Sequence, residues 1–277
     1  MSENQKKIWV TGASTGIGKA VAEKFSKEGW KVAISARREE LLKNIAQDNN
    51  IFDYPLDVTN EKKVDEVFKK ILEDFKNIDL CIFNAGTYEP KLEKEISKEQ
   101  IRKTMEVNFF GVVNCIKAVE KHFKNTKNGH ISIVSSIAGY RGLPNSSGYG
   151  PSKAAVSNLA ESLYFDFKKD NVKISLISPG FIKTPMTDKN EFRMPFIKSP
   201  EFAAEKIYNG LVKSNSFEIT FPKQLTTLFK FFRILPNRIY LFLKIQHSHQ
   251  LRQLSLQQQL FVNCLLLNYF DLILEVL

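Results

Sequence analysis

Residues 7–18 read KIWVTGASTGIG, and this stretch decides the fold. The apolar run Lys7–Thr11 predicts a strand, and Ile17–Lys27 has the spacing of an amphipathic helix. Glycines between them allow a tight turn and a close approach to a phosphate group. The N-terminus of the helix adds N–H donors and a partial positive charge. The stretch therefore predicts a phosphate-binding turn, and the alternative is a tight strand-to-helix connection without a ligand.

Strand-like and helix-like segments alternate outward from this turn. The predicted strands are Lys7–Thr11, Lys31–Ser35, Ile51–Pro55, Asp79–Phe83, His130–Ser135, Lys173–Ser178 and Phe217–Phe221. The predicted helices are Ile17–Lys27, Glu39–Gln47, Glu61–Phe75, Ile101–Phe123, Tyr149–Lys168 and Ala203–Lys213. This alternation predicts an α/β fold with a doubly wound, mostly parallel sheet of about seven strands and helices on both faces. We expect it to form one domain over residues 1–222, with ligands at the carboxyl ends of its strands.

Composition excludes several other classes of protein. The chain has 277 residues, of which 43% are hydrophobic and 25% charged, as in ordinary globular domains. Its three cysteines, Cys81, Cys115 and Cys264, lie far apart and form no Cys-x-x-Cys pair, so we expect no metal site. The N-terminal residues lack the long apolar region of a signal peptide, and no strongly apolar run is long enough to span a membrane. These features predict a cytoplasmic protein.

Polar residues at the ends of the predicted strands favour a dinucleotide that carries a phosphate on its ribose 2′ position. The second strand ends at Arg37 and Arg38, where an acidic residue would otherwise bind a ribose 2′-hydroxyl. Arginine suits a 2′-phosphate, so NADP is favoured over NAD. Arg37 is the preferred ligand, and Arg38 is either a second ligand or a solvated charge. Asp57-Val58 is expected at the adenine edge, and Asn84-Ala85-Gly86 forms a small-residue turn beside the cofactor.

A second set of residues has the chemistry of proton transfer. Tyr149 and Lys153 are four residues apart, so they share one face of a predicted helix. A nearby ammonium favours the phenolate, which lowers the tyrosine pKa toward neutrality. Ser136 follows the fifth strand, where it can hold a substrate oxygen. Asn108 lies in the middle of an apolar predicted helix, which points to a local hydrogen-bonding role.

In these motifs the sequence resembles the short-chain dehydrogenase/reductase family over residues 6–222. The matching features are the glycine turn of residues 11–18, Asn84-Ala85-Gly86, Asn108, Ser136, Tyr149-x-x-x-Lys153, and Pro179-Gly180 with Thr184. The resemblance implies a Rossmann-type fold. It also implies a cofactor site that includes Gly12, Ser14, Thr15, Gly16, Ile17, Gly18, Arg37, Pro179, Gly180, Ile182 and Thr184.

The resemblance also implies roles for the second set. Tyr149 would be the acid and base, and Ser136 would orient the carbonyl or alcohol. Lys153 would lower the pKa of Tyr149 and bind the nicotinamide ribose, and Asn108 would hold a water that relays protons to Lys153. Thr15 departs from the basic residue that many NADP-preferring members carry at this position, so cofactor preference depends mainly on Arg37.

Together these features predict an NADP(H)-dependent oxidoreductase that interconverts a carbonyl and an alcohol. Apolar side chains after the fifth and sixth strands predict an apolar, lipid-like ketone or aldehyde as substrate; they are Tyr140, Leu143, Phe181, Met186, Met194 and Phe196. Arg141 or Lys183 could serve a charged group. The alternatives are a non-catalytic NADP-binding sensor or scaffold on the same fold, and a membrane-associated reductase of a lipid-derived ketone. Members of the family commonly form dimers or tetramers, so a homodimer or homotetramer is expected.

Residues 223–277 are a basic and apolar C-terminal extension, which we expect to be helical and not an independent domain. Between Phe221 and Arg252 there are six basic residues and no acidic one. Residues 221–244 could bind an anionic membrane surface peripherally, or could cover the substrate cleft or a subunit interface. No nucleic-acid-binding module is recognisable, so no nucleic acid is expected. The last 33 residues lack lysine, which marks either an appended helical tail or sequence foreign to the fold.

Overall fold

The computed structural model describes residues 5–90 and 96–247. Its sheet contains β1 (Lys7–Thr11), β2 (Lys31–Ser35), β3 (Ile51–Asp53), β4 (Leu80–Phe83), β5 (Gly129–Val134), β6 (Val172–Pro179) and β7 (Glu218–Phe221). The helices are α1 (Gly16–Lys27), α2 (Glu39–Ile45), α3 (Glu61–Phe75), α4 (Lys98–Met105), α5 (Gly111–Thr126), α6 (Tyr149–Lys168), α7 (Pro200–Val212), α8 (Lys223–Ile234) and α9 (Asn237–His247). The tail beyond residue 247, including its predicted helical character, lies outside the described residues.

All seven strands are parallel, in the order β3-β2-β1-β4-β5-β6-β7. The chain builds outward from β1 to β3, crosses back to β4, and then builds outward to β7. The strand order therefore reverses between β1 and β4, and such a reversal opens a crevice at the carboxyl ends of the strands. The predicted doubly wound sheet is confirmed.

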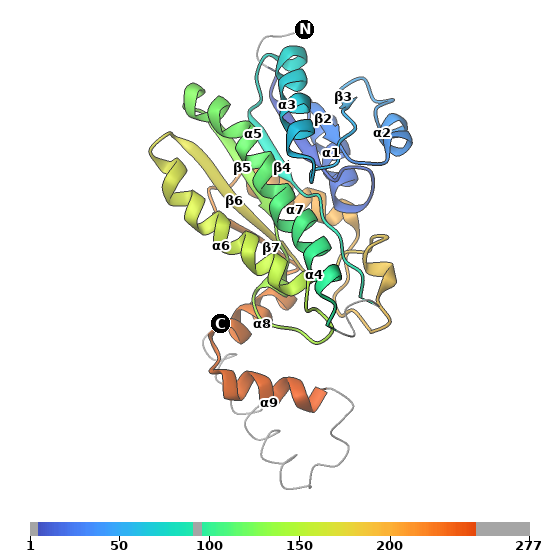
Figure 1. The fold of residues 1–277 in the computed structure, drawn as a ribbon, viewed down its shortest axis with the longest axis vertical. Helices are drawn as coiled ribbons and strands as arrows, with labels where there is room; N and C mark the ends of the chain where they lie inside the picture. Colours follow the sequence, from blue (N-terminus) through green and yellow to red (C-terminus); the bar gives the residue numbers. More distant parts are fainter. Residues whose placement is uncertain (1–4, 91–95, 248–277) are drawn as a thin grey trace, which may run out of the picture. The chain divides into compact units, whose positions relative to one another are not determined.

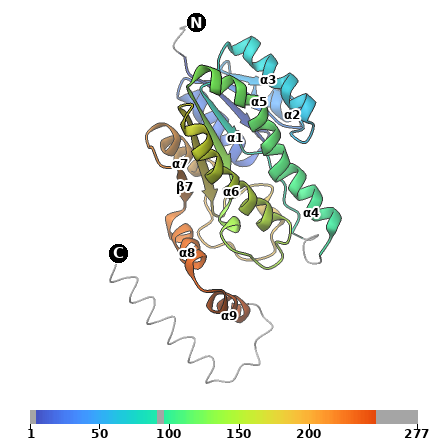
Figure 2. The same ribbon diagram turned by 60° about the vertical axis from the view of Figure 1, so that its left-hand side comes forward.

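Helices cover both faces of the sheet, and each face has its own apolar core (Figures 1 and 2). Buried residues of α3, α5 and α6 pack on one face around Trp9 and Phe83. Buried residues of α1, α2 and α7 pack on the other face around Ile8, Val10 and Phe25. The strands read as continuous apolar runs because they are buried on both sides.

The predicted helix Ile101–Phe123 was wrong in one respect: the chain forms two helices with a π-helical turn, Glu106–Phe110, between them. Asn108 lies at the centre of this turn, completely buried. Its amide exchanges hydrogen bonds with the backbone of Thr87, with Nδ2 to O at 3.0 Å and N to Oδ1 at 2.7 Å. Short π-helical turns are uncommon and are often found at functional sites.

The C-terminal region divides from the rest of the chain after the start of α8. The two compact units are Met1–Lys230 and Phe231–Leu277. Within the first unit, Leu225 and Phe229 of α8 are buried against Ile137 and Tyr140. The first turns of α8 therefore belong to the core of the sheet domain. No helix within residues 5–90 and 96–247 has the length and apolar character needed to cross a bilayer.

Candidate active site

A cleft of about 720 Å³ lies at the carboxyl ends of the central strands. It is lined by residues at or after the ends of β1, β2, β3, β4, β5 and β6, as expected for the point where the strand order reverses. Most residues proposed from the sequence line it, namely Gly12, Ser14, Thr15, Gly16, Ile17, Arg37, Arg38, Asp57, Val58, Asn84, Ala85, Gly86, Ser136, Tyr149, Lys153, Pro179, Gly180, Ile182 and Thr184. Segments that are far apart in sequence thus meet at one cleft.

Two positions of the glycine turn have no room for a side chain. Gly12 has φ +67°, and a Cβ there would lie 2.6 Å from the Ala85 Cα atom. A Cβ on Gly18 would lie 2.4 Å from the Gly12 carbonyl oxygen, so Gly18 lets α1 pack closely behind the turn. The Asn84 side chain holds the turn by donating Nδ2 to the Gly12 oxygen at 3.0 Å.

The turn carries hydroxyl groups and a positive charge at the cleft. The N-terminus of α1 follows directly from Ser14 and Thr15, whose hydroxyls line the cleft with the Arg38 guanidinium. Arg38 Nη2 donates to Ser14 Oγ at 2.8 Å and to Thr15 Oγ1 at 2.9 Å. A helix N-terminus beside a fixed guanidinium suits phosphate groups. Arg37 and Arg38 are both exposed and both line the cleft, but only Arg38 has a hydrogen bond to the turn among the described residues.

Ser136, Tyr149 and Lys153 lie on the same cleft because β5 ends next to the start of α6. Ser136 follows β5 and caps the turn Ile137–Gly139, accepting a hydrogen bond from the Ala138 N–H at 3.2 Å. Tyr149 is the first residue of α6, so it faces the cleft at the end of the helix. Lys153 Nζ lies 5.8 Å from the centroid of the Tyr149 ring.

The Lys153 ammonium is buried. Its Nζ donates to the Val134 carbonyl oxygen at 2.9 Å, and the residue is 4% exposed. Burial lowers the pKa of Lys153 to about 8, because water no longer solvates the charge. At pH 7 the side chain is still mainly protonated. A buried cation next to a phenol is the arrangement expected to stabilise the phenolate.

Asn108 lies behind the wall of the cleft. Its Nδ2 also donates to Ser152 Oγ at 2.9 Å, and Ser152 lies between Tyr149 and Lys153 in sequence. A Cβ on Gly86 would lie 3.4 Å from Asn108 Oδ1 and 3.6 Å from Lys153 Nζ. The amide oxygen of Asn108 and the ammonium of Lys153 thus flank the same small space beside Gly86.

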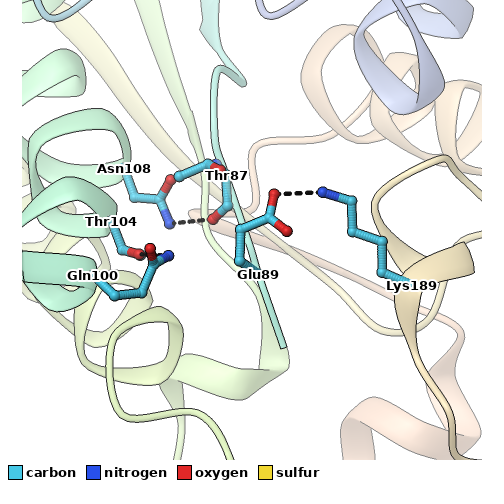
Figure 3. Close-up of polar contacts among 6 residues, drawn as sticks. All are labelled: Thr87, Glu89, Gln100, Thr104, Asn108 and Lys189. Carbon is cyan, nitrogen blue, oxygen red and sulfur yellow. Dashed lines mark hydrogen bonds and ion pairs between the residues drawn. The ribbon is translucent and has the colours of Figure 1, made fainter. Parts of the chain in front are cut away.

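Several cleft residues were not identified from the sequence. Thr87, Tyr88 and Glu89 follow the turn after β4, and the Tyr88 ring lies 4.7 Å from that of Tyr149. Lys189, after β6, forms an ion pair with Glu89 (Figure 3). This pair joins two loops that both line the cleft. The only indication in the sequence was that Glu89 and Lys189 lie in the loops after β4 and β6. Neither residue belongs to a recognisable sequence motif.

The apolar lining predicted for the substrate was partly wrong. Met186 does line the cleft. Tyr140, Leu143 and Phe181 instead pack with Leu225 and Phe229 of α8. Tyr140 turns that way because its hydroxyl donates to the Glu218 carboxylate, a partner that lies far away in sequence.

Comparison with known proteins decides the family. The family model described as short chain dehydrogenase matches residues 6–194, which is more than half of the chain. The chain belongs to the short-chain dehydrogenase family. The predicted resemblance is thereby confirmed.

Relatives of this short-chain dehydrogenase include an uncharacterised oxidoreductase of Myxococcus xanthus, 33% identical over 236 residues, which are 83% of this chain and 93% of the relative. A 3-oxoacyl-(acyl-carrier-protein) reductase of Thermotoga maritima is 31% identical over 185 residues, which are 65% of this chain and 75% of the relative. Among solved structures, ElxO with NADP bound is 31% identical with a TM-score of 0.70, over 78% of this chain and 97% of that one. A short-chain dehydrogenase of Streptomyces avermitilis is 25% identical with a TM-score of 0.74, over 82% and 91%.

Proposed function

We propose that this protein is an NADP(H)-dependent oxidoreductase that interconverts a carbonyl and an alcohol. The observation that carries the proposal is the meeting of Ser136, Tyr149 and the buried Lys153 ammonium on the same cleft as the glycine turn. The bound NADP in ElxO supports the choice of cofactor. The Thermotoga reductase, named for a 3-oxoacyl substrate, supports the choice of reaction.

The residues of the cleft fit a nicotinamide dinucleotide. The glycine turn, the α1 N-terminus and Arg38 would hold the phosphates, and Pro179, Gly180, Ile182 and Thr184 would line the nicotinamide end. A Cβ on Gly16 would lie 2.9 Å from Thr184 Cγ2, so the glycine turn and the loop after β6 lie together on one side of the cleft. When bound, the cofactor supplies or accepts the hydride at the substrate carbon.

The residues of the chain then handle the substrate oxygen and its proton. The Ser136 hydroxyl donates a hydrogen bond to that oxygen and orients it. In reduction, the Tyr149 hydroxyl would give its proton to the substrate oxygen, and in oxidation the phenolate would take it back. The Lys153 ammonium stabilises the phenolate through the low-dielectric interior. Asn108 would hold a water in the space beside Gly86, through which Lys153 exchanges protons with solvent.

We propose an apolar ketone or aldehyde as the substrate class. Tyr88, Val107, Pro185 and Met186 contribute apolar surface to the cleft. Tyr88 packs against the ring of Tyr149, next to the position that a substrate carbonyl would take. Such surfaces favour apolar or aromatic groups attached to the reacting carbon.

Cofactor preference is tested by titrating the purified protein with NADPH and with NADH. We expect tighter binding of NADPH. Arg37→Ala should weaken NADPH binding about tenfold or more and leave NADH binding nearly unchanged, since a hydrogen bond to a charged group contributes about 1.5–3 kcal/mol. Arg38→Ala should weaken both cofactors, because Arg38 also holds Ser14 and Thr15 in place.

Arg102→Ala serves as the matched control, because Arg102 is exposed on α4 and does not line the cleft. An unchanged ratio of NADPH to NADH affinity in Arg37→Ala would show that Arg37 does not select the 2′-phosphate. No binding of either cofactor to the wild-type protein would contradict the proposed function.

We also propose peripheral contact with an anionic membrane, narrowed from residues 221–244 to residues 231–242 because Leu225 and Phe229 are buried. Ile234, Ile239, Leu241 and Phe242 are exposed, and Arg233 and Arg238 lie among them. Apolar side chains among basic ones favour the surface of an anionic bilayer. Liposomes with anionic lipid should co-sediment the wild-type protein, and Leu241→Ser with Phe242→Ser should reduce the bound fraction several-fold. Equal recovery in the supernatant with and without liposomes would reject this contact.

A further inference from the structure

The carboxylate of Glu218, at the start of β7, has three side-chain partners from three separate segments of the chain. Glu218 Oε1 accepts hydrogen bonds from Ser178 Oγ, at 2.8 Å, and from the Tyr140 hydroxyl. Glu218 Oε2 pairs with Lys230 Nζ of α8 at 2.7 Å. The Glu218 side chain is only 18% exposed. We refer to Glu218, Tyr140, Ser178 and Lys230 as the Glu218 cluster.

The cluster stabilises the charged form of Glu218. Burial alone would raise the pKa of this carboxyl, but the bonds from Lys230, Tyr140 and Ser178 outweigh it and lower the pKa below its ordinary value. Glu218 is therefore ionised at neutral pH. Hydrogen bonds to an ionised carboxylate are shorter and stronger than bonds between neutral groups, and they are stronger again where water is excluded.

Two partners of Glu218 belong to segments that shape the candidate active site. Tyr140 directly follows the turn Ile137–Gly139, which Ser136 caps. Ser178 directly precedes Pro179 and Gly180, which line the cleft. One carboxylate oxygen therefore connects the segment that carries Ser136 to the turn expected at the nicotinamide end.

Apolar packing reinforces the same connection from α8. Leu225 and Phe229 are buried against Ile137 and Tyr140. A Cβ on Gly180 would lie 2.9 Å from Leu225 Cδ2, so α8 also packs closely against the second segment. An ion pair that served only to attach α8 would need Lys230 alone. The bonds to Tyr140 and Ser178 are additional, and both lead to the cleft.

We propose that Glu218 is a positioning residue for this reaction. It fixes the Ser136 segment relative to the Pro179–Gly180 turn, and through Lys230 it makes α8 part of the support of the active site. The inference rests on the proposed function, because it concerns the Ser136 hydroxyl and the nicotinamide end of the cleft. Reacting groups must be held within fractions of an ångström, so residues that support them affect rate without touching the substrate.

The first test is amide hydrogen exchange by mass spectrometry on Glu218→Gln and Tyr140→Phe. Both variants keep the shape of the side chain. We expect faster exchange in segments 136–143 and 178–182 in both, with little change in β1 and α1. Glu205→Gln is the matched control: the Lys24–Glu205 ion pair, at 2.6 Å, also joins two elements that are far apart in sequence, but these are α1 and α7. Unchanged exchange in segments 136–143 and 178–182 would overturn the inference.

The second test is turnover of a carbonyl substrate with NADPH by the same variants and Glu218→Ala. We expect kcat to fall about 10- to 100-fold in Glu218→Ala, with a smaller change in KM. Glu218→Gln should retain part of the activity, since its amide oxygen can still accept from Tyr140 and Ser178. Faster exchange with unchanged kcat, or an equal fall in Glu205→Gln, would overturn the positioning role.

The two tests separate this inference from the proposed function. A wild-type protein that turns over no carbonyl would contradict the proposed function. The exchange comparison would still decide whether Glu218 holds the two segments together, because it does not depend on catalysis.

Discussion

Tyr149→Phe should lose carbonyl turnover while still binding NADPH. The substitution removes one hydroxyl from a side chain that opens α6 and faces the cleft. In the proposed mechanism this hydroxyl is the acid and base, and such groups typically contribute 10²- to 10⁴-fold to the rate. We therefore expect kcat to fall by about two to four orders of magnitude. The measurement is NADPH oxidation with a panel of apolar ketones and aldehydes, together with a binding titration.

Tyr164→Phe provides the matched control, because it is the same substitution on an exposed residue of the same helix. It should leave turnover unchanged. This comparison also decides between an enzyme and an NADP-binding sensor. A wild-type protein that binds NADPH but turns over nothing would favour the sensor, whereas turnover that survives in Tyr149→Phe would remove the proposed acid and base role of Tyr149.

Lys153→Met should abolish turnover and change how stability depends on pH. Burial lowers the pKa of Lys153 to about 8 in the folded protein, from 10.5 for an exposed lysine. Between these pH values the unfolded chain binds the proton and the folded chain releases it, so stability rises with pH through this window. The charged form thus costs the folded cofactor-free protein stability below pH 8. The fall in the Lys153 pKa from 10.5 to about 8, at 1.36 kcal/mol per pKa unit, makes this cost about 3 kcal/mol.

The measurement is the free energy of unfolding in urea, without cofactor, from pH 7 to pH 10. The rise over this range should be about 2 kcal/mol larger in the wild-type protein than in Lys153→Met. Lys168→Met, an exposed residue of α6, should follow the wild type. If the free energy of unfolding depends on pH in the same way in the wild type and in Lys153→Met, burial does not lower the pKa of Lys153. Turnover retained in Lys153→Met would remove the proposed role of its ammonium.

Much of the fold followed from local patterns. The seven strands and the helix of residues 61–75 are confirmed, because each strand is a mainly apolar run and the helix has a 3.6-residue apolar period. The division of the predicted helix Ile101–Phe123 could not be foreseen. Its π-helical turn is stabilised by Asn108 contacts with Thr87 and Ser152, which come from distant parts of the chain.

The candidate site was predictable where function needs a residue type at a fixed place after a strand or at a fixed spacing on a helix. Gly12, Asn84, Ser136, Tyr149 and Lys153 all reach the cleft for this reason. Residues whose role depends on a tertiary partner were not predictable. Tyr140 was expected in the cleft, but it donates to Glu218, which lies on the last strand of the sheet. Arg38 donates a hydrogen bond to the glycine turn. The sequence could not show which of the two neighbouring arginines, Arg37 or Arg38, makes this contact.

The two outer strands of the sheet have a consequence for how this protein behaves at high concentration. The edges are formed by β3, of three residues, and β7, of four residues. An exposed strand edge is a template onto which a strand of another molecule can add, and such addition starts aggregation. Short edges offer few backbone groups for this pairing. The interior of the sheet is rich in apolar residues with high β-propensity. Its two short edge strands, however, offer few backbone groups with which another molecule could pair.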